Sequence, residues 1–124
     1  MKWAVPVTLN RNSIPPAAVS KSSRDIPKSF VLSGAYPNPF NPSTRIDFDI
    51  PFECGRDGIP VRLEIYDSRG MKVRSLLQDR YGPGRYSIQW NGQADNGRAA
   101  TSGYYLCKMM AGTFMMSQGM LLMR

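Results

Sequence analysis

The sequence contains no histidine and only two cysteines, and these shortages limit the chemistry open to its 124 residues. Without histidine, the chain lacks the general base of Ser-His-Asp and Cys-His catalytic arrangements and a principal ligand of zinc sites. Cys54 and Cys107 fit no metal-binding spacing and permit at most one disulfide. Two interpretations stay open: a disulfide formed in an oxidising compartment, or a buried thiol at Cys107 and an incidental one at Cys54.

Long apolar runs and phosphate-binding glycine patterns are also missing. No segment approaches the roughly 18 to 20 apolar residues of a transmembrane helix, so the chain is not expected to be transmembrane. Neither Walker-type nor dinucleotide glycine spacing occurs. The first residues lack the apolar segment of a secretory signal, so no signal peptide is visible in this chain.

The acidic and amide residues suggest structural roles. Asp47 and Asp49 lie two positions apart on the solvent face of a predicted strand, where no pocket is implied. Asn91, Asp95 and Asn96 do not match a calcium-loop pattern, and turn formation accounts for all three. The sequence therefore predicts no enzyme, no cofactor, no metal and no small-molecule substrate.

Basic residues outnumber acidic ones by 16 to 9, which gives a net charge of +7. Such an excess is one feature of nucleic-acid-binding proteins. Here the basic residues are scattered singly over alternating and turn segments, and they form no basic helix or stripe. We therefore expect protein partners and no nucleic acid.

Alternation of apolar and polar residues predicts an all-β fold from Thr44 onward. With 10 prolines, 11 glycines and no helical period, the pattern indicates an immunoglobulin-like antiparallel β-sandwich. About seven strands are expected, and the chain should end in a hairpin formed by residues 104–110 and 114–123. The residues predicted to face inward on the two middle strands are Met71, Val73, Leu77, Tyr86, Ile88 and Trp90.

Residues 1–33 differ from the predicted sandwich domain at 34–124. They are rich in proline and serine and show no sustained period, which indicates an extended arm or linker. Within the arm, Trp3, Val5 and Val7 lie on alternate positions, as on one face of a strand. Either this is chance alternation in a disordered tail, or these residues are partner contacts in a strand that adds to a neighbouring subunit or domain.

Methionine is concentrated near the C-terminus, where six of the eight residues fall in the predicted terminal hairpin. They occupy both of its faces, so one set should fill the core and the other should be exposed unless a partner covers it. Met115, Met116, Met120 and Met123 are therefore candidate partner contacts. The alternative is that surface methionines have no such role.

An unusual segment precedes the first regular strand: Tyr36-Pro37-Asn38-Pro39-Phe40-Asn41-Pro42-Ser43-Thr44. Its prolines fix φ and bias the residues before them away from the helical region, so the segment should be stiff and extended. Its asparagines are suited to bonding nearby backbone groups. We expect Phe40 to pack as a plug over one end of the sandwich core.

This segment resembles the opening of the type A C-terminal sorting domains of the type IX (Por) secretion system. The fold of those domains is similar to the Ig-like domain of the flagellar hook-capping protein. Other landmarks appear in the family's order: a lead-in at 26–32, a strand and turn at 61–70, a strand with Trp90, and Gly103 before the penultimate strand. The resemblance covers residues 26–124, although Gln118 and Gly119 stand where the family usually carries basic residues.

The resemblance implies a non-catalytic C-terminal sorting or anchoring module of an exported bacterial protein. Such a module would be extracellular or at the cell surface, with the secretion machinery as its protein partner. The alternative is a structural subunit of an extracellular or cell-surface assembly. That subunit would use the N-terminal arm and the Met-rich hairpin as its contacts.

Overall fold

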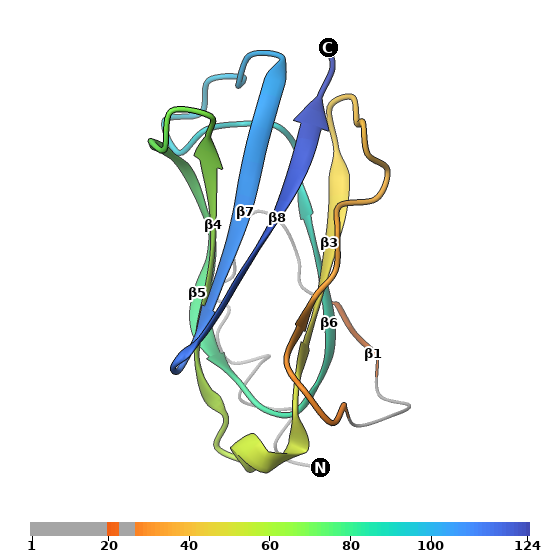
Figure 1. The fold of residues 1–124 in the computed structure, drawn as a ribbon, viewed down its shortest axis with the longest axis vertical. Coiled ribbons are helices and arrows are strands. Elements are labelled where there is room, and N and C mark those ends of the chain that lie inside the picture. The colour runs from red at the N-terminus through yellow and green to blue at the C-terminus, as the bar shows by residue number, and fades with distance from the viewer. Residues whose placement is uncertain (1–19, 23–26) are drawn as a thin grey trace.

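The computed structural model describes residues 20–22 and 27–124 of the chain. They form two four-stranded antiparallel sheets packed face to face (Figure 1). The strand order is β1-β6-β3-β2 in the first sheet and β5-β4-β7-β8 in the second. The predicted β-sandwich is therefore confirmed. These residues include no helix with the length and apolarity needed to cross a membrane.

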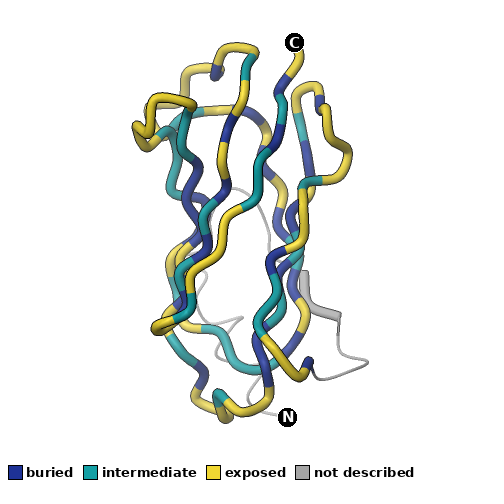
Figure 2. The backbone as a smooth tube through the Cα atoms, viewed as in Figure 1, coloured by how far each residue is buried: buried dark blue, intermediate teal, exposed yellow. Residues whose placement is uncertain are grey.

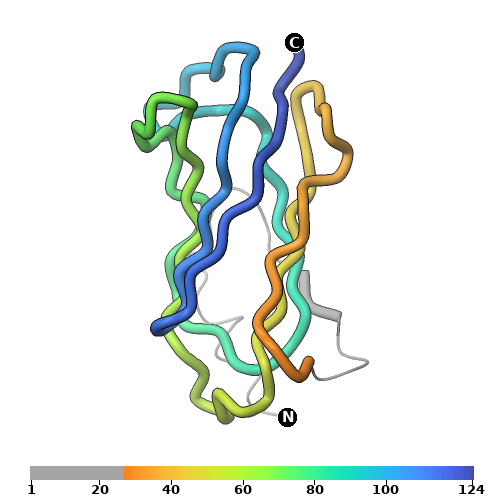
Figure 3. Tube along the Cα trace, in the orientation of Figure 1, coloured from red at the N-terminus to blue at the C-terminus, as the bar shows by residue number. Residues whose placement is uncertain are grey.

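The strands divide between the two sheets as follows. Those of the first sheet are β1 (Ser20–Ser22), β2 (Val31–Leu32), β3 (Thr44–Ile50) and β6 (Gly84–Trp90). Those of the second sheet are β4 (Ile59–Asp67), β5 (Lys72–Tyr81), β7 (Gly103–Ala111) and β8 (Phe114–Leu122). A short 3₁₀ turn, η2 (Phe52–Cys54), lies between β3 and β4, and the chain passes repeatedly from one sheet to the other (Figure 3).

Part of the predicted arm belongs to the sandwich. β1 pairs with β6, and β2 pairs with β3. Leu32 is buried, and the ring of Phe30 stacks on that of Phe114 with centroids 4.6 Å apart. Residues before position 34 therefore contribute to the folded unit, because their apolar side chains complete its core.

Alternating burial along the strands produces the core between the sheets (Figure 2). On β3, Ile46, Phe48 and Ile50 are buried while the residues between them are not, as the sequence predicts. On β6, Ile88 and Trp90 are buried in the same way. Each sheet thus presents one apolar face to the other, which is the arrangement that makes a sandwich stable.

The pattern predicted for β5 is partly wrong. Met71 lies in the turn before the strand and is exposed, and its backbone N–H donates to the Asp67 carboxylate at 3.0 Å. Leu76 and Leu77 are adjacent and both buried. The register between β4 and β5 shifts in this region, because β5 has one extra residue. The extra residue reverses the side of the sheet toward which the next side chains of β5 point.

Phe48, Tyr81 and Tyr86 form an aromatic group against the core. The rings of Phe48 and Tyr86 stack with centroids 5.2 Å apart, and Tyr81 meets both at their edges. Burial raises the pKa of Tyr81 and of Tyr86 from 10.0 to about 12. Folding therefore favours the neutral phenols, and their contribution to stability is lost as the pH rises from about 10 to about 12.

Candidate functional site

The segment Tyr36–Thr44 lies along the edge of the last strand. Phe40 N–H donates to the Leu121 carbonyl at 3.0 Å, and Met123 N–H donates to the Phe40 carbonyl at 2.9 Å. These bonds form a parallel bridge between Phe40 and Leu122, so the segment runs beside the end of β8 (Figure 1). We call residues 36–44 together with 119–124 the C-terminal clamp.

Asn38 completes this edge with its side chain. Its Oδ1 accepts a hydrogen bond from Leu121 N–H at 2.9 Å, and its Nδ2 donates to the Gly119 carbonyl at 3.5 Å. The amide therefore satisfies backbone groups that a neighbouring strand would otherwise bind. Within the segment, Thr44 Oγ1 donates to the Pro37 carbonyl at 2.7 Å.

Phe40 is the predicted plug. Its side chain is 2% exposed, and its ring lies 5.7 Å from that of Trp90, centroid to centroid. Trp90 in turn contacts the edge of Tyr105 at 5.5 Å and donates from Nε1 to the Gln93 carbonyl at 2.9 Å. The opening segment thus covers one end of the core with an aromatic ring, as the sequence predicts.

Arg124 fixes the chain after β8. Its backbone N–H donates to Ser102 Oγ at 2.9 Å, and its guanidinium donates to the carbonyls of Ala100 at 2.7 Å and Gly92 at 2.8 Å. Gly92 has a φ of +79°, and a Cβ there would lie 2.9 Å from both Arg124 Nη2 and the Pro42 carbonyl oxygen. Sequence reasoning missed these contacts, because they join residues far apart in the chain.

The residues predicted to form the structural motif gather at this one end of the sandwich. Thr44 is paired with Trp90 at the end of β3 and β6, and Gly103 is paired with Leu122 at the end of β7 and β8. The three Xaa-Pro peptide bonds of the segment are cis. The motif residues thus placed are Tyr36, Pro37, Asn38, Pro39, Phe40, Asn41, Pro42, Trp90 and Gly103.

The candidate methionine contacts divide between surface and core. Met115, Met116 and Met123 are exposed, at 59%, 38% and 52%. Met120 is 1% exposed, because it lies opposite the buried Tyr105 on the inward face of β8. It is therefore not available as a surface contact in the folded domain. The arm candidates Trp3, Val5 and Val7 lie outside the described residues.

Cys54 and Cys107 are free thiols in this structure. Cys107 lies in β7 four residues before Ala111, the end of that strand. Cys54 lies in η2, between β3 and β4. Burial raises the pKa of the Cys107 thiol to about 12, which matches the buried-thiol alternative.

A buried carboxylate lies on the outer face of the second sheet. Glu64 is 5% exposed and accepts a hydrogen bond from Tyr66 OH at 2.6 Å. Arg62 and Lys72 form ion pairs with the same carboxylate at 3.6 and 3.8 Å, and Lys108 lies over the Tyr66 ring. Sequence alternation places Glu64 on the solvent face of β4, but it does not report which side chains the neighbouring strands place beside it.

Tyr104 and Leu106 continue this outer face toward the clamp, and both are exposed. The Tyr104 ring covers Gly119: a Cβ on Gly119 would lie 2.9 Å from the Tyr104 hydroxyl oxygen. An aromatic side chain packed over a glycine of the adjacent strand compensates for the missing side chain. The clamp is thus supported from the outer face as well as from the edge.

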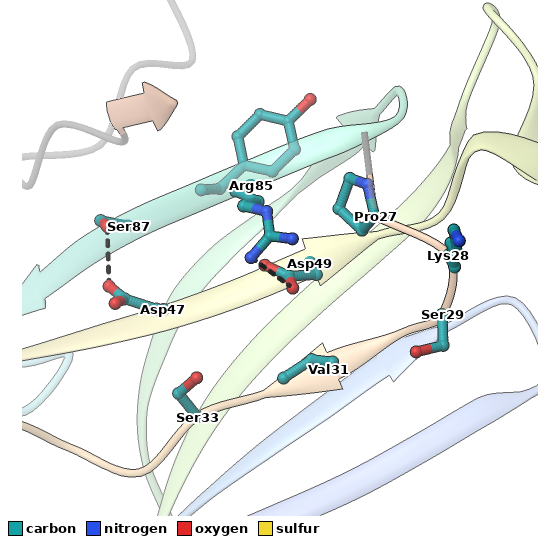
Figure 4. Close-up of a pocket in the computed structure, with 10 residues that line it drawn as sticks. Pro27, Lys28, Ser29, Val31, Ser33, Asp47, Asp49, Arg85 and Ser87 are labelled. Carbon is teal, nitrogen blue, oxygen red and sulfur yellow. Dashed lines mark hydrogen bonds and ion pairs between the residues drawn. The ribbon is translucent and has the colours of Figure 1, made fainter. Parts of the chain in front are cut away.

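A groove of about 550 Å³ crosses the outer face of the first sheet (Figure 4). Its two carboxylates already have partners: Ser87 Oγ donates to Asp47 at 2.7 Å, and Arg85 forms an ion pair with Asp49 at 3.7 Å. Burial raises the pKa of Asp49, and the charge of Arg85 opposes that shift. The paired groups fit the solvated face expected from the sequence.

The loop oxygens considered for calcium take part in backbone bonding. Asn91 Oδ1 accepts from Gln93 N–H at 3.1 Å, and Asn96 Oδ1 accepts from Arg98 N–H at 2.9 Å. The Asp95 carboxylate accepts from the Ser75 N–H at 3.0 Å. Among residues 20–22 and 27–124, no three acidic or cysteine side chains gather as metal ligands would.

Residues 56–113 match the family model of the FlgD Ig-like domain. The matched segment contains β4 to β7, the strands that form most of the second sheet and part of the first. No curated protein matches the chain significantly. Since the architecture agrees with this match, the fold is an immunoglobulin-like β-sandwich.

Two solved structures from Porphyromonas gingivalis are similar to the chain. The crystal structure of dimeric latent PorU is 20% identical with a TM-score of 0.57, over 88% of this chain and 10% of that one. PorZ, an essential bacterial surface component of the type-IX secretion system, is 19% identical with a TM-score of 0.49, over 75% and 11%. The chain thus spans about a tenth of the length of each, and the similarity to PorU concerns the fold alone.

Proposed function

We propose that this chain is a non-catalytic C-terminal sorting or anchoring module of an exported bacterial surface protein. The C-terminal clamp is the observation that carries the proposal. The landmarks that resemble type A sorting domains, from the opening segment to Trp90 and Gly103, lie at the same end of the sandwich as the last residues of the chain. Because these landmarks lie close together, we propose that they share one structural role, which is to fix the position of β8.

Holding that strand matters for a recognition signal. The last residues of a domain are usually poorly ordered unless other contacts fix them. Here the backbone and side chain of the opening segment, the rings of Phe40 and Trp90, and the bonds of Arg124 fix them together. A sorting machinery would therefore meet β8 in one defined shape, at a lower entropic cost of binding.

The bonding of the acidic side chains supports a non-catalytic role. Asp47, Asp49, Glu64 and Asp95 each bind a backbone N–H, a hydroxyl or a basic side chain of the same domain. A general acid or base needs a titratable group directed toward a substrate site. These four groups instead connect strands and loops, so a structural and recognition role accounts for them.

The test is an export experiment. The whole chain is fused to the C-terminus of a reporter carrying a general export signal and is expressed in a bacterium with a type IX secretion system. Surface reporter is measured by protease sensitivity of intact cells. We expect surface reporter only with the fused chain and only in the secretion-competent strain. Equal surface reporter without the chain, or in a secretion-deficient strain, would contradict the proposal.

A structural subunit of a surface assembly is the second candidate function. The exposed Tyr104, Leu106 and Met115 on the second sheet favour it, because large exposed apolar side chains often mark contacts. Isolation of the native protein distinguishes the sorting module from the structural subunit. Isolation of the chain as a stoichiometric component of a large complex, with no export of the fused reporter, would favour the subunit.

A further inference from the structure

The two edge strands of the second sheet differ in their protection. β5 carries four charged residues, and its register on β4 shifts. Asp95 also covers the backbone of β5: its carboxylate accepts from Ser75 N–H, and its own N–H donates to the Val73 carbonyl. β8 contains no charged residue and no proline, and its pairing with β7 is continuous from Phe114 to Leu122. Exposed edges are normally protected by charges, prolines or bulges, and β8 has none of them.

Only part of the β8 edge is covered by the clamp. Leu121 and Met123 direct backbone groups away from β7, because both bind the opening segment. Backbone direction alternates along an antiparallel strand, so Met115, Ser117 and Gly119 face the same way. Within the described residues, β8 is the last strand of its sheet. We call residues 115–117 the open edge; Figure 2 colours residues at this part of β8 as exposed.

The clamp demonstrates what this edge can bind. Phe40 already pairs with the upper part of β8 as an extended segment in parallel orientation. The open edge continues the same line toward the β7–β8 turn. Met115 on the outer face and Met116 on the inner face flank it and are exposed, so an added strand would find apolar side chains on both sides.

We propose that the open edge binds an extended strand of a partner protein, with alternating apolar and acidic side chains, by β-strand addition. The charge nearby favours an acidic strand: Lys28 is two residues from Phe30, whose ring stacks on that of Phe114 in β8, and β8 itself carries no charged residue. A second copy of this chain would bring its own net charge of +7, which opposes pairing of two copies. The inference rests on the proposed function, because the strand would belong to the protein that recognises the module.

The first test uses amide hydrogen exchange of the whole chain, measured by NMR. In the free protein, we expect fast exchange at Met115 and Ser117 and slow exchange at Leu121 and Met123. A soluble peptide of alternating valine and glutamate should slow exchange at the open edge by about tenfold or more. Absence of protection, or equal protection by a peptide of alternating valine and lysine, would overturn the proposal.

The second test removes one edge donor. Proline at Ser117 deletes an outward N–H without removing a ladder bond to β7, so S117P should remain folded and lose the protection by the peptide. S117T keeps the N–H and should behave as the wild type. If S117P does not fold, S117E replaces it as the test variant. Its added carboxylate should repel the acidic peptide and so reduce the protection, while the strand stays intact.

Export of the fused reporter separates the two proposals. We expect S117P, or S117E in its place, to lose surface reporter while S117T retains it. Normal export of both edge variants would overturn the role of the open edge and leave the sorting function standing. Failure of the wild-type fusion to reach the surface would count against the sorting function, whereas the peptide experiment would still test the edge.

Discussion

Replacing Phe40 with alanine should remove the plug of the C-terminal clamp. The side chain is 2% exposed and contacts the Trp90 ring, so the substitution leaves a cavity at the end of the core. Truncation of a buried phenylalanine costs about 3 to 5 kcal/mol, which combines the lost transfer free energy with the cavity. A small domain has only about 5 to 15 kcal/mol of unfolding free energy, so the variant should be marginally stable.

The assay is urea unfolding followed by circular dichroism for the wild type, F40A and a matched control. Phe52 is the control, because it is a phenylalanine on the same chain whose side chain is 64% exposed. F52A should change the unfolding free energy by less than about 0.5 kcal/mol. The dependence of free energy on urea should be unchanged in both variants, which shows that they unfold from the same compact state.

A loss below about 1 kcal/mol in F40A would refute the plug, because a fully buried ring cannot be removed so cheaply. A loss in F52A as large as in F40A would refute it too. The first result would mean that the opening segment is held by its backbone bonds alone. The second would mean that the η2 turn is packed more tightly than its exposure indicates.

Three further predictions concern bonds and titration. Asn38→Ala should destabilise the domain by about 1 kcal/mol and accelerate exchange of the Leu121 amide, measured by NMR. The buried phenols of Tyr81 and Tyr86 should ionise near pH 12 in the folded chain, and stability should fall between about pH 10 and 12, as followed by tyrosinate absorbance and circular dichroism. Cys107 should resist thiol reagents until the domain unfolds, while the other thiol reacts in the native state.

Local pattern was sufficient to predict the strands from Thr44 onward. Alternation identified the inward residues of β3 and β6, because a period of two determines which face of a strand is apolar whatever its neighbours are. The composition of the opening segment indicated a stiff stretch with Phe40 as a plug. The pattern failed at Met71, which lies in the turn before β5, and at Leu76, where a register shift against β4 changed the face. Such a shift depends on the partner strand.

The sequence by itself determined an all-β sandwich, a stiff segment before its first regular strand, and a last strand without charge. Only the tertiary structure decided that Asn38 binds Leu121, 83 residues away, and that Arg124 reaches Gly92. It also decided that Met120 is core and that Glu64 is buried among cations. The physical reason is that local periodicity defines the faces of a strand, whereas strand order and register determine which distant residues meet.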